Sequence, residues 1–228
     1  MQTIRLKQEK LPYAVNEELK LLRTNILFCG ADKRVILVTS AFSGEGKSTV
    51  TLDLCRSLAE LGRSVVLIDA DMRKSVLKRR VVSQLPEHGL SHYLSGQCTL
   101  DDVICETDTQ LFYMVLNGTV PPNPTELLAS ENMKELLTFC RENFDYVIID
   151  SPPVGLVVDA AVIAPLCDGN VILIEANEVK YRLAQEVVAK MQATNCPILG
   201  VILNKVTSKK YGKSYGKYYG KKYKEYYA

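Results

Sequence analysis

The chain has 228 residues, 47% of them hydrophobic, and a formal net charge of +2 at pH 7. This length and composition suffice to bury one substantial core, so we predict one main domain with two small appendages. No apolar run is long enough to cross a membrane, and the charged start lacks the apolar core of a signal peptide, which predicts a cytoplasmic protein.

The first predicted helix covers residues 16–29. Asn16 is a suitable N-cap, and a glycine directly follows the helical pattern. One face is apolar, whereas Glu17, Lys20 and Arg23 recur every three residues on another part of the surface. Neighbours at this spacing can pair with each other or with a second chain. Two interpretations therefore stay open, a solvated charged face and a contact surface between chains.

The most specific pattern lies in residues 35–49, VILVTSAFSGEGKST. Four apolar or β-branched residues predict a strand buried on both faces, which leads directly into a loop of small residues. From Ala41 to Ser48 the loop fits the phosphate-binding spacing G-x-x-x-x-G-K-[ST], except that Ala41 replaces the first glycine. Its glycines let backbone N–H groups converge on phosphate oxygens at the start of the next helix. Lys47 would then neutralise the β and γ phosphates, and the Ser48 hydroxyl would bind Mg²⁺.

Acidic residues follow two other predicted strands. The strand 64–68 runs into Asp69 and Asp71, and the strand 146–149 ends at Asp150. In an open, doubly wound sheet the carboxyl ends of the strands lie beside the phosphate loop, so we predict that the three acids meet there. Asp69 and Asp71 would point to the same side if the strand continued through them. Such acids are costly to bury unless a cation or a proton transfer uses them.

Buried strands alternate with helices along the chain. The predicted strands are 35–38, 64–68, 111–116, 146–149, 171–175 and 198–203. Between them we predict helices at 48–61, 89–96, 125–128, 133–142 and 182–194, with Thr125 as the cap of the short third one. This order predicts an α/β fold of the P-loop NTPase type, with a predominantly parallel, doubly wound sheet and helices on both faces. Asn204 and Lys205 lie just past the last strand, where a loop that reads a nucleotide base would sit.

The composition changes abruptly at Lys209. From there to Ala228 the chain carries seven Lys against one Glu, a charge of +6, so the preceding residues carry −4. Such a segment cannot bury a core and is predicted to be a disordered tail. It holds seven of the twelve tyrosines: Tyr211, Tyr215, Tyr218, Tyr219, Tyr223, Tyr226 and Tyr227. By composition alone, the tail also fits stacking on RNA or docking on an anionic membrane.

A set of motifs in the chain resembles the bacterial tyrosine kinases of capsule and exopolysaccharide assembly. The set comprises SAFSGEGKS, VVLIDADMR, VIIDSPP, the loop PPNPTELL and the terminal tyrosine cluster. The similarity is closest to the split type of Gram-positive bacteria, in which the kinase is a separate chain that a membrane modulator protein activates. Single motifs are shared with partitioning and cell-division ATPases. Those ATPases place an additional lysine early in the phosphate loop, where this chain has Phe42 or Ser43.

The resemblance implies ATP and Mg²⁺ as ligands. It implies nucleotide contacts from the phosphate loop and the loop after the last strand: Ser43, Gly44, Glu45, Gly46, Lys47, Ser48, Thr49 and Asn204. Ser48, Asp71 and Asp150 would hold the metal ion. Lys47 and the three acids would carry phosphoryl transfer, with Asp69 accepting the tyrosine proton and the tail tyrosines as acceptors.

The resemblance also implies partners and domain boundaries. Family members form a ring through an E-x-x-R-x-x-R helix, read here as Glu17, Lys20 and Arg23, and the ring is expected to be an octamer. Lys in place of the first Arg lacks the planar fork that forms bidentate carboxylate pairs. Further implied partners are the cytoplasmic segment of a membrane modulator, which would recruit the chain to the inner face of the membrane, and a phosphotyrosine phosphatase, but no nucleic acid. The implied parts are an N-terminal segment with the oligomerisation helix at 1–30, the kinase domain at 31–208 and the tail at 209–228.

The predicted function is an ATP-dependent protein-tyrosine kinase that phosphorylates its own tail in trans and regulates polysaccharide synthesis and export. One alternative is a P-loop ATPase switch without a tyrosine acceptor. Another is a scaffold without enzymatic activity, whose basic tail recruits anionic partners.

Overall fold

The computed structural model describes residues 1–206. The predicted tail 209–228, with its seven tyrosines, therefore lies outside the described residues. Within residues 1–206, no helix combines the length and the apolar character that a membrane span requires.

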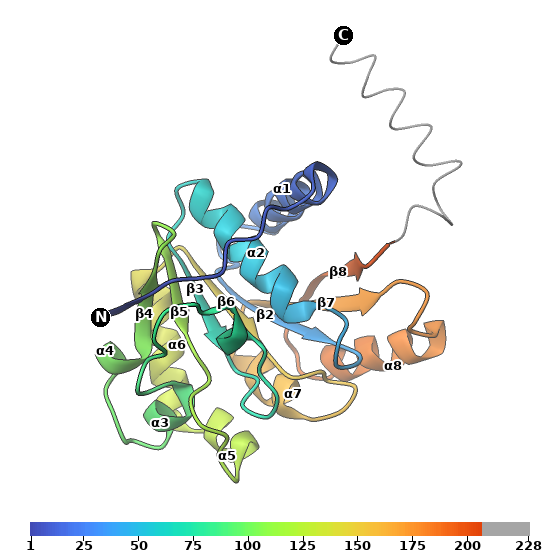
Figure 1. Cartoon of the computed structure of the whole chain (residues 1–228). Helices are drawn as coiled ribbons and strands as arrows, with labels where there is room; N and C mark the ends of the chain where they lie inside the picture. The colour runs from blue at the N-terminus through green and yellow to red at the C-terminus, as the bar shows by residue number, and fades with distance from the viewer. Residues whose placement is uncertain (207–228) are drawn as a thin grey trace.

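Eight strands of the described residues form one sheet in the order β1-β4-β5-β3-β6-β2-β7-β8 (Figure 1). Their bounds are Gln2–Ile4 (β1), Val35–Ser40 (β2), Val65–Asp69 (β3), Ile104–Thr107 (β4), Phe112–Val115 (β5), Tyr146–Asp150 (β6), Gly169–Glu175 (β7) and Ile198–Asn204 (β8). Every neighbouring pair is parallel except β4 and β5, which are antiparallel. The central strands β2, β3 and β6 consist of buried residues throughout, as expected for strands covered on both faces.

Helices cover both faces of this sheet. One face carries α1 (Tyr13–Phe28), α2 (Lys47–Glu60) and the short 3₁₀ helix η1 (Leu77–Arg80). The other face carries α3 (Leu90–Leu94), α4 (Leu100–Val103), α5 (Pro124–Leu128), α6 (Glu131–Asn143), α7 (Asp159–Ile163), η2 (Ala164–Leu166) and α8 (Tyr181–Gln192). The side chains of successive β2 residues point alternately into the two cores, since Leu37 packs into one core and Ile36 into the other. The predicted doubly wound α/β fold is confirmed.

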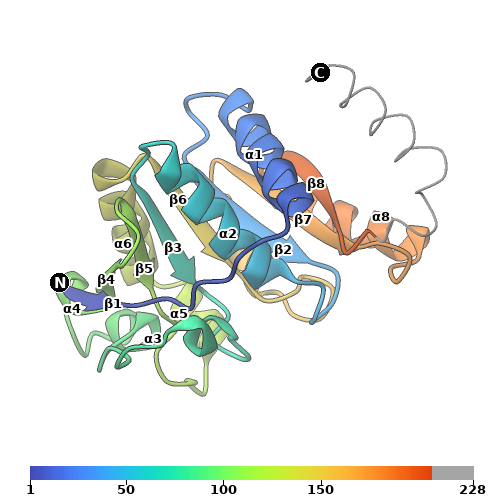
Figure 2. The same ribbon diagram turned by 45° about the horizontal axis from the view of Figure 1, so that its top comes forward.

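The sequence-based prediction missed two strands and misjudged the N-terminus. The first residues are not merely a polar lead, because β1 pairs with β4 and both Ile4 and Leu6 are buried. The segment then crosses α2, where Arg56 donates to the carbonyl of Lys7, before it enters α1 (Figure 2). A three-residue strand and one next to a short helix are too brief to show a clear alternation in the sequence.

Two predicted helix caps are wrong. The first helix begins at Tyr13, directly after Pro12, so Asn16 lies inside it rather than at its start. Helix α5 begins at Pro124, with Asn123 at the N-cap position, because proline suits the first helical turn. The hydroxyl of Thr125 instead donates to Asp159.

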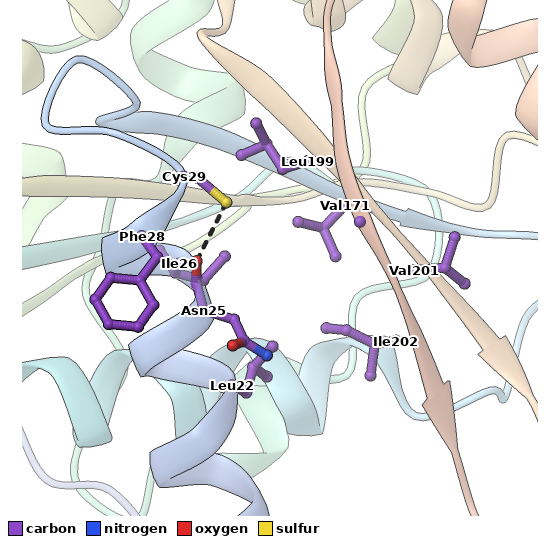
Figure 3. A pocket seen from close by; sticks show the side chains of 10 residues that line it. Leu22, Asn25, Ile26, Phe28, Cys29, Val171, Leu199, Val201 and Ile202 are labelled. Carbon is purple, nitrogen blue, oxygen red and sulfur yellow. Dashed lines mark hydrogen bonds between the residues drawn. The ribbon is translucent and has the colours of Figure 1, made fainter.

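The last strand, predicted to be buried, is a half-exposed edge of the sheet. Val201 and Leu203 are 53% and 55% exposed. Between β8 and α1 runs an apolar groove of about 300 Å³ (Figure 3). Its lining comes from both elements and from Val171 of β7: Leu22, Asn25, Ile26, Phe28, Cys29, Leu199, Gly200, Val201 and Ile202. The groove shares no residue with the phosphate loop.

Candidate active site

The loop between β2 and α2 has the backbone of a phosphate-binding loop. Gly44 and Gly46 have φ of 90° and 92°, a left-handed conformation that glycine adopts without strain. Ala41, which replaces the first glycine of the pattern, has no positive φ and is fully buried, so a side chain is tolerated there. Residues 43–46 make no N–H hydrogen bond to the backbone of the described residues, and the first N–H groups of α2 have no partner in the helix. These donors are available for an anion.

Glu45 stabilises this loop through its side chain. Its buried carboxylate accepts hydrogen bonds from the N–H of Phe42 (2.7 Å) and from the N–H of Glu175 (2.9 Å). The carboxylate therefore links the loop to the end of β7. Asn204, at the end of β8, donates to the Glu45 carbonyl at 2.7 Å. The predicted nucleotide contact of Asn204 remains a prediction, but the residue does lie against the phosphate loop.

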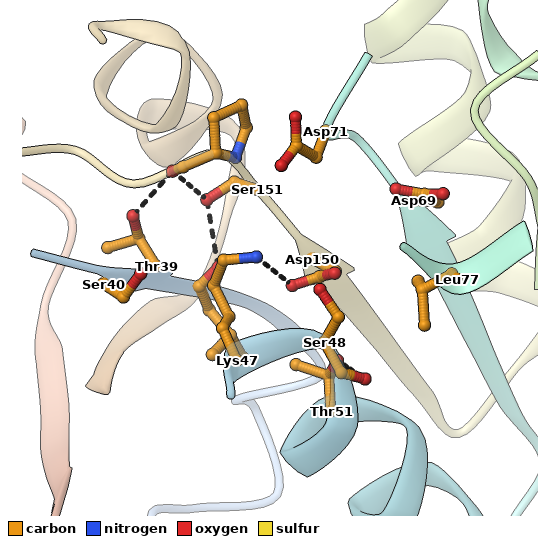
Figure 4. Close-up of polar contacts among 12 residues, drawn as sticks. Thr39, Ser40, Lys47, Ser48, Thr51, Asp69, Asp71, Leu77, Asp150 and Ser151 are labelled. Atoms are coloured by element: carbon orange, nitrogen blue, oxygen red, sulfur yellow. Dashed lines mark hydrogen bonds and ion pairs between the residues drawn. The ribbon is translucent and has the colours of Figure 1, made fainter. Parts of the chain in front are cut away.

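Lys47 and Asp150 form a buried ion pair (Figure 4). The Nζ of Lys47 lies 2.5 Å from Oδ1 of Asp150, and the two side chains are 7% and 1% exposed. A charge pair this deeply buried is costly to desolvate and adds little net stability, which favours a functional role for the two groups. The other oxygen of Asp150, Oδ2, has no hydrogen-bond partner among the described residues.

Asp69 ends β3, directly beside Asp150 in the sheet register. Burial and the neighbouring charge of Asp150 raise the pKa of its carboxyl to about 8, against the hydrogen bond that Ser75 donates to Oδ2. The Oδ1 atom is buried and unpartnered within residues 1–206. One oxygen of a carboxyl with a pKa near neutrality is thus available to exchange a proton.

Asp71 lies beyond the end of the strand, so the period-two argument for its direction does not apply. It follows Asp69 in a turn, where its Oδ1 accepts hydrogen bonds from the N–H groups of Arg73 (3.2 Å) and Lys74 (2.9 Å). Figure 4 shows the three acids at the carboxyl ends of β3 and β6, and Ser48 in the first turn of α2. The structure thus brings together Lys47, Ser48 and the three acids, while their roles stay predictions.

These residues fit a Mg²⁺ ion bound together with a nucleotide. Within residues 1–206, no three His, Cys, Asp or Glu side chains form a metal cage. Mg²⁺ in phosphate-transfer sites keeps waters and takes one or two carboxylates beside the phosphates, so such a cage is not required. The unpartnered Oδ2 of Asp150 and the hydroxyl of Ser48 are oxygen ligands of the required kind.

The remaining predicted residues have varied surroundings. Thr49 accepts a hydrogen bond from Arg80 at 3.0 Å, and Ser43 is exposed. On α1, Glu17 pairs with Lys20 at 2.7 Å in the same helix. Arg23 donates to the carbonyl of Ser57 on α2 at 2.9 Å, so its guanidinium is partly engaged inside the chain.

Comparisons with known proteins agree with this geometry. A family model described as the CobQ/CobB/MinD/ParA nucleotide binding domain (CbiA) matches residues 36–224. The tyrosine-protein kinase CpsD of Streptococcus agalactiae is 42% identical over 202 residues, which cover 89% of this chain and 87% of that protein. The chain belongs to the bacterial tyrosine kinases. CpsD of Streptococcus pneumoniae is 39% identical, over 90% of this chain and 92% of its own length. The kinase domain of Escherichia coli ETK shares the fold with a TM-score of 0.81 and 28% identity, over 89% of this chain and 83% of that one.

Several contacts that shape the site of this family member were not predicted. Thr39 donates to the carbonyl of Pro152 and accepts from the N–H of Val154, which joins β2 to the segment after β6. Lys205 donates to the carbonyl of Gly44 at 2.8 Å. The sequence places Lys205 with Asn204 in the loop after the last strand, but it does not predict the contact with Gly44, because contacts between distant segments leave no local pattern.

Proposed function

We propose that the chain is an ATP-dependent protein-tyrosine kinase that phosphorylates its own C-terminal tyrosines in trans. The observation that carries the proposal is the buried carboxyl of Asp69 with a free Oδ1, beside the Lys47–Asp150 pair at the phosphate loop. A base of this kind can take the phenol proton as the tyrosine oxygen attacks phosphorus. Similarity to tyrosine-protein kinases over most of the chain supports the choice of acceptor.

The residues would act in named roles. Lys47, released from Asp150, would neutralise charge on the β and γ phosphates, while the N–H groups of the loop hold the phosphate chain. Ser48, Asp71 and Asp150 would hold Mg²⁺, which screens the phosphate charge and orients the transferred group. Asp69 Oδ1 would accept the proton of the acceptor tyrosine. Asn204 would lie at the base end of the nucleotide.

The tail can reach a neighbouring chain. A segment of twenty residues would span an r.m.s. distance of roughly 25 Å as a flexible coil and at most about 70 Å when extended. The last described strand ends at Asn204, against the phosphate loop, seven residues before Tyr211. We infer that the tail of one chain enters the site of another within a ring.

The proposed partners follow the family. We propose assembly through α1, on which Leu21 and Phe28 are 56% and 82% exposed and offer apolar contact area on the same helix as Glu17 and Lys20. We further propose activation at the membrane by the cytoplasmic segment of a modulator protein and reversal by a phosphotyrosine phosphatase. The cellular role would be control of capsular or exopolysaccharide synthesis and export.

Lys47→Met should abolish tail phosphorylation without unfolding the domain. We expect at least about a hundredfold less phosphotyrosine by mass spectrometry, since a preorganised charge on the transferred group is lost. The matched control is Lys134→Met, which removes a surface lysine paired with Glu131 on α6. Wild-type labelling of the Lys47 variant would refute the role of this lysine. ATP hydrolysis by wild type without any phosphotyrosine would favour an ATPase switch, and the absence of both would favour a scaffold.

A further inference from the structure

Arg73 joins three segments beside the site. Its Nε donates to Oδ2 of Asp159 at 2.7 Å and its Nη2 donates to Oδ1 of the same carboxylate at 3.0 Å. The Nη2 also donates to the hydroxyl of Thr125 at 2.9 Å, and that hydroxyl donates to Asp159 at 2.7 Å. The guanidinium therefore connects the loop after β3 with the first residue of α7 and with α5.

The pair is built around a completely buried charge. The side chain of Asp159 is 0% exposed, whereas that of Arg73 is 39% exposed. Removal of Arg73 would leave an uncompensated carboxylate inside the protein, so the pair strongly constrains its neighbours. Bidentate geometry adds directional restraint, because both N–H···O bonds need the planar guanidinium in one orientation.

The segment that carries Asp71 is held at both of its ends. At one end, Asp69 and Asp150 are neighbours in the register of β3 and β6, and the N–H of Ala70 donates to the Asp150 carbonyl at 2.9 Å. At the other end, Arg73 and Asp159 join the segments that continue from these two strands. Asp71 lies between the two connections. The N–H of Arg73 also binds the Asp71 carboxylate directly.

We propose that Arg73 is a positioning residue that holds the Asp71 carboxylate at the correct place relative to Asp150 for binding of Mg²⁺ with the nucleotide. The inference rests on the metal ligands of the proposed function. The backbone of Arg73 orients the carboxylate, and its side chain prevents the loop from moving away from the segment after β6. Residues that orient metal ligands typically contribute about 10- to 100-fold to metal affinity or activity.

Arg73→Lys tests this role, because lysine keeps the charge and loses the fork. The protein offers a matched control in Arg141, which pairs with Asp168 at 2.9 Å and is 38% exposed. Asp168 binds the N–H groups of Arg34 and Val35 at the amino end of β2, the opposite end of the sheet from the site. Arg141→Lys therefore changes a similar ion pair without touching the acids.

The experiment measures binding of a fluorescent N-methylanthraniloyl ADP to the full chain, first in EDTA and then during a Mg²⁺ titration. For Arg73→Lys we expect unchanged affinity in EDTA and about a tenfold rise in the Mg²⁺ concentration that gives half of the binding enhancement. Arg141→Lys should behave like wild type. Thr125→Val removes the hydroxyl from the same cluster and should raise the half-saturating Mg²⁺ concentration about threefold, which keeps the test valid if Arg73→Lys does not fold.

Several outcomes would overturn the inference. These are a wild-type Mg²⁺ response in Arg73→Lys, an equal loss in Arg141→Lys, and a loss of ADP affinity that is already complete in EDTA. The assay uses no tyrosine phosphorylation. A chain that binds Mg²⁺ with ADP but labels no tyrosine would refute the proposed function and leave the role of Arg73 standing.

Discussion

Ionisation of the Asp69 carboxyl is costly in the folded protein. Its pKa is raised to about 8 by burial and by Asp150, whereas in an unfolded chain it would be about 3.9. Between these values the folded protein binds more protons than the unfolded one. The free energy of unfolding therefore falls as the pH rises from about 4 to about 8, and the loss is complete above the folded pKa. At pH 8 the cost is on the order of several kcal/mol.

Asp69→Asn should therefore stabilise the protein while it abolishes tyrosine phosphorylation. The amide resembles the protonated carboxyl, so the cost of ionising it in the folded state disappears. Without Mg²⁺ and nucleotide, we expect the Tm at pH 8 to rise by at least about 3 °C, with a difference that shrinks as the pH is lowered toward 5. Thermal unfolding monitored by circular dichroism across this pH range measures the effect.

Asp168→Asn is a control for which we expect the opposite change in Tm. Burial raises the pKa of Asp168, but hydrogen bonds from Arg141 and from the N–H groups of Val35 and Arg34 outweigh this effect and lower it. A lowered pKa stabilises the folded state above the unfolded value, so this variant should lose Tm at pH 8. An Asp69→Asn variant that is less stable than wild type at pH 8 would contradict the inference that ionised Asp69 destabilises the folded protein.

At the scale of elements, the phosphate loop depends on a close contact with the segment after β6. A Cβ added at Gly155 would overlap the carbonyl oxygen of Ala41, so only glycine lets the two backbones approach this closely. Thr39 joins the same two segments through Pro152 and Val154. The position of the loop is therefore set by the connection between β6 and α7 as well as by β2.

Gly155→Ala should displace the phosphate loop. We expect ADP affinity to fall by about tenfold or more and the free energy of unfolding to fall by about 1–3 kcal/mol, the usual range for an overpacked site. Gly200→Ala is the control, because its added Cβ meets no atom within 4 Å. Binding of ADP by calorimetry and urea unfolding measure both effects. Normal ADP binding by Gly155→Ala would show that the loop does not need this contact.

Local sequence patterns predict the elements that position the site, but they do not predict contacts between segments that are distant in the sequence. The strand, loop and helix around Lys47 were found because each has its own sequence signature, and the acids Asp69 and Asp150 because strand ends share one edge of a parallel sheet. The sequence does not predict β1, which has only three residues, or β4, which follows α4 directly and so has no turn residues to separate it from the helix. The side-chain role of Glu45 was also missed, because its partners at Phe42 and Glu175 are set by the folded backbone. The sequence around Gly155 indicates only a turn, because its close contact with Ala41 exists only in the folded chain.

At the scale of the whole molecule, charge is divided between body and tail. The twenty tail residues carry +6, and residues 1–208 carry −4. Opposite charges favour contact between the tail of one chain and the body of another before phosphorylation. Each phosphotyrosine adds about −1.5 to −2, so four already reverse the sign of the tail.

Phosphorylation should therefore dissolve the assembly through α1 that we propose for the unphosphorylated chain. Tails of negative charge, gathered around a ring, repel each other and the negative body, and this repulsion acts over a Debye length of about 8 Å at physiological salt. We expect light scattering to give an oligomer for Lys47→Met and a much smaller mass for phosphorylated wild type at the same concentration. Treatment of the phosphorylated protein with a tyrosine phosphatase should restore the oligomer, which separates the effect of the tail from any effect of Lys47 on nucleotide binding. Higher salt should partly restore it as well, because screening weakens the repulsion. Equal masses before and after phosphatase treatment would leave the ring, if it forms, independent of the charge on its tails.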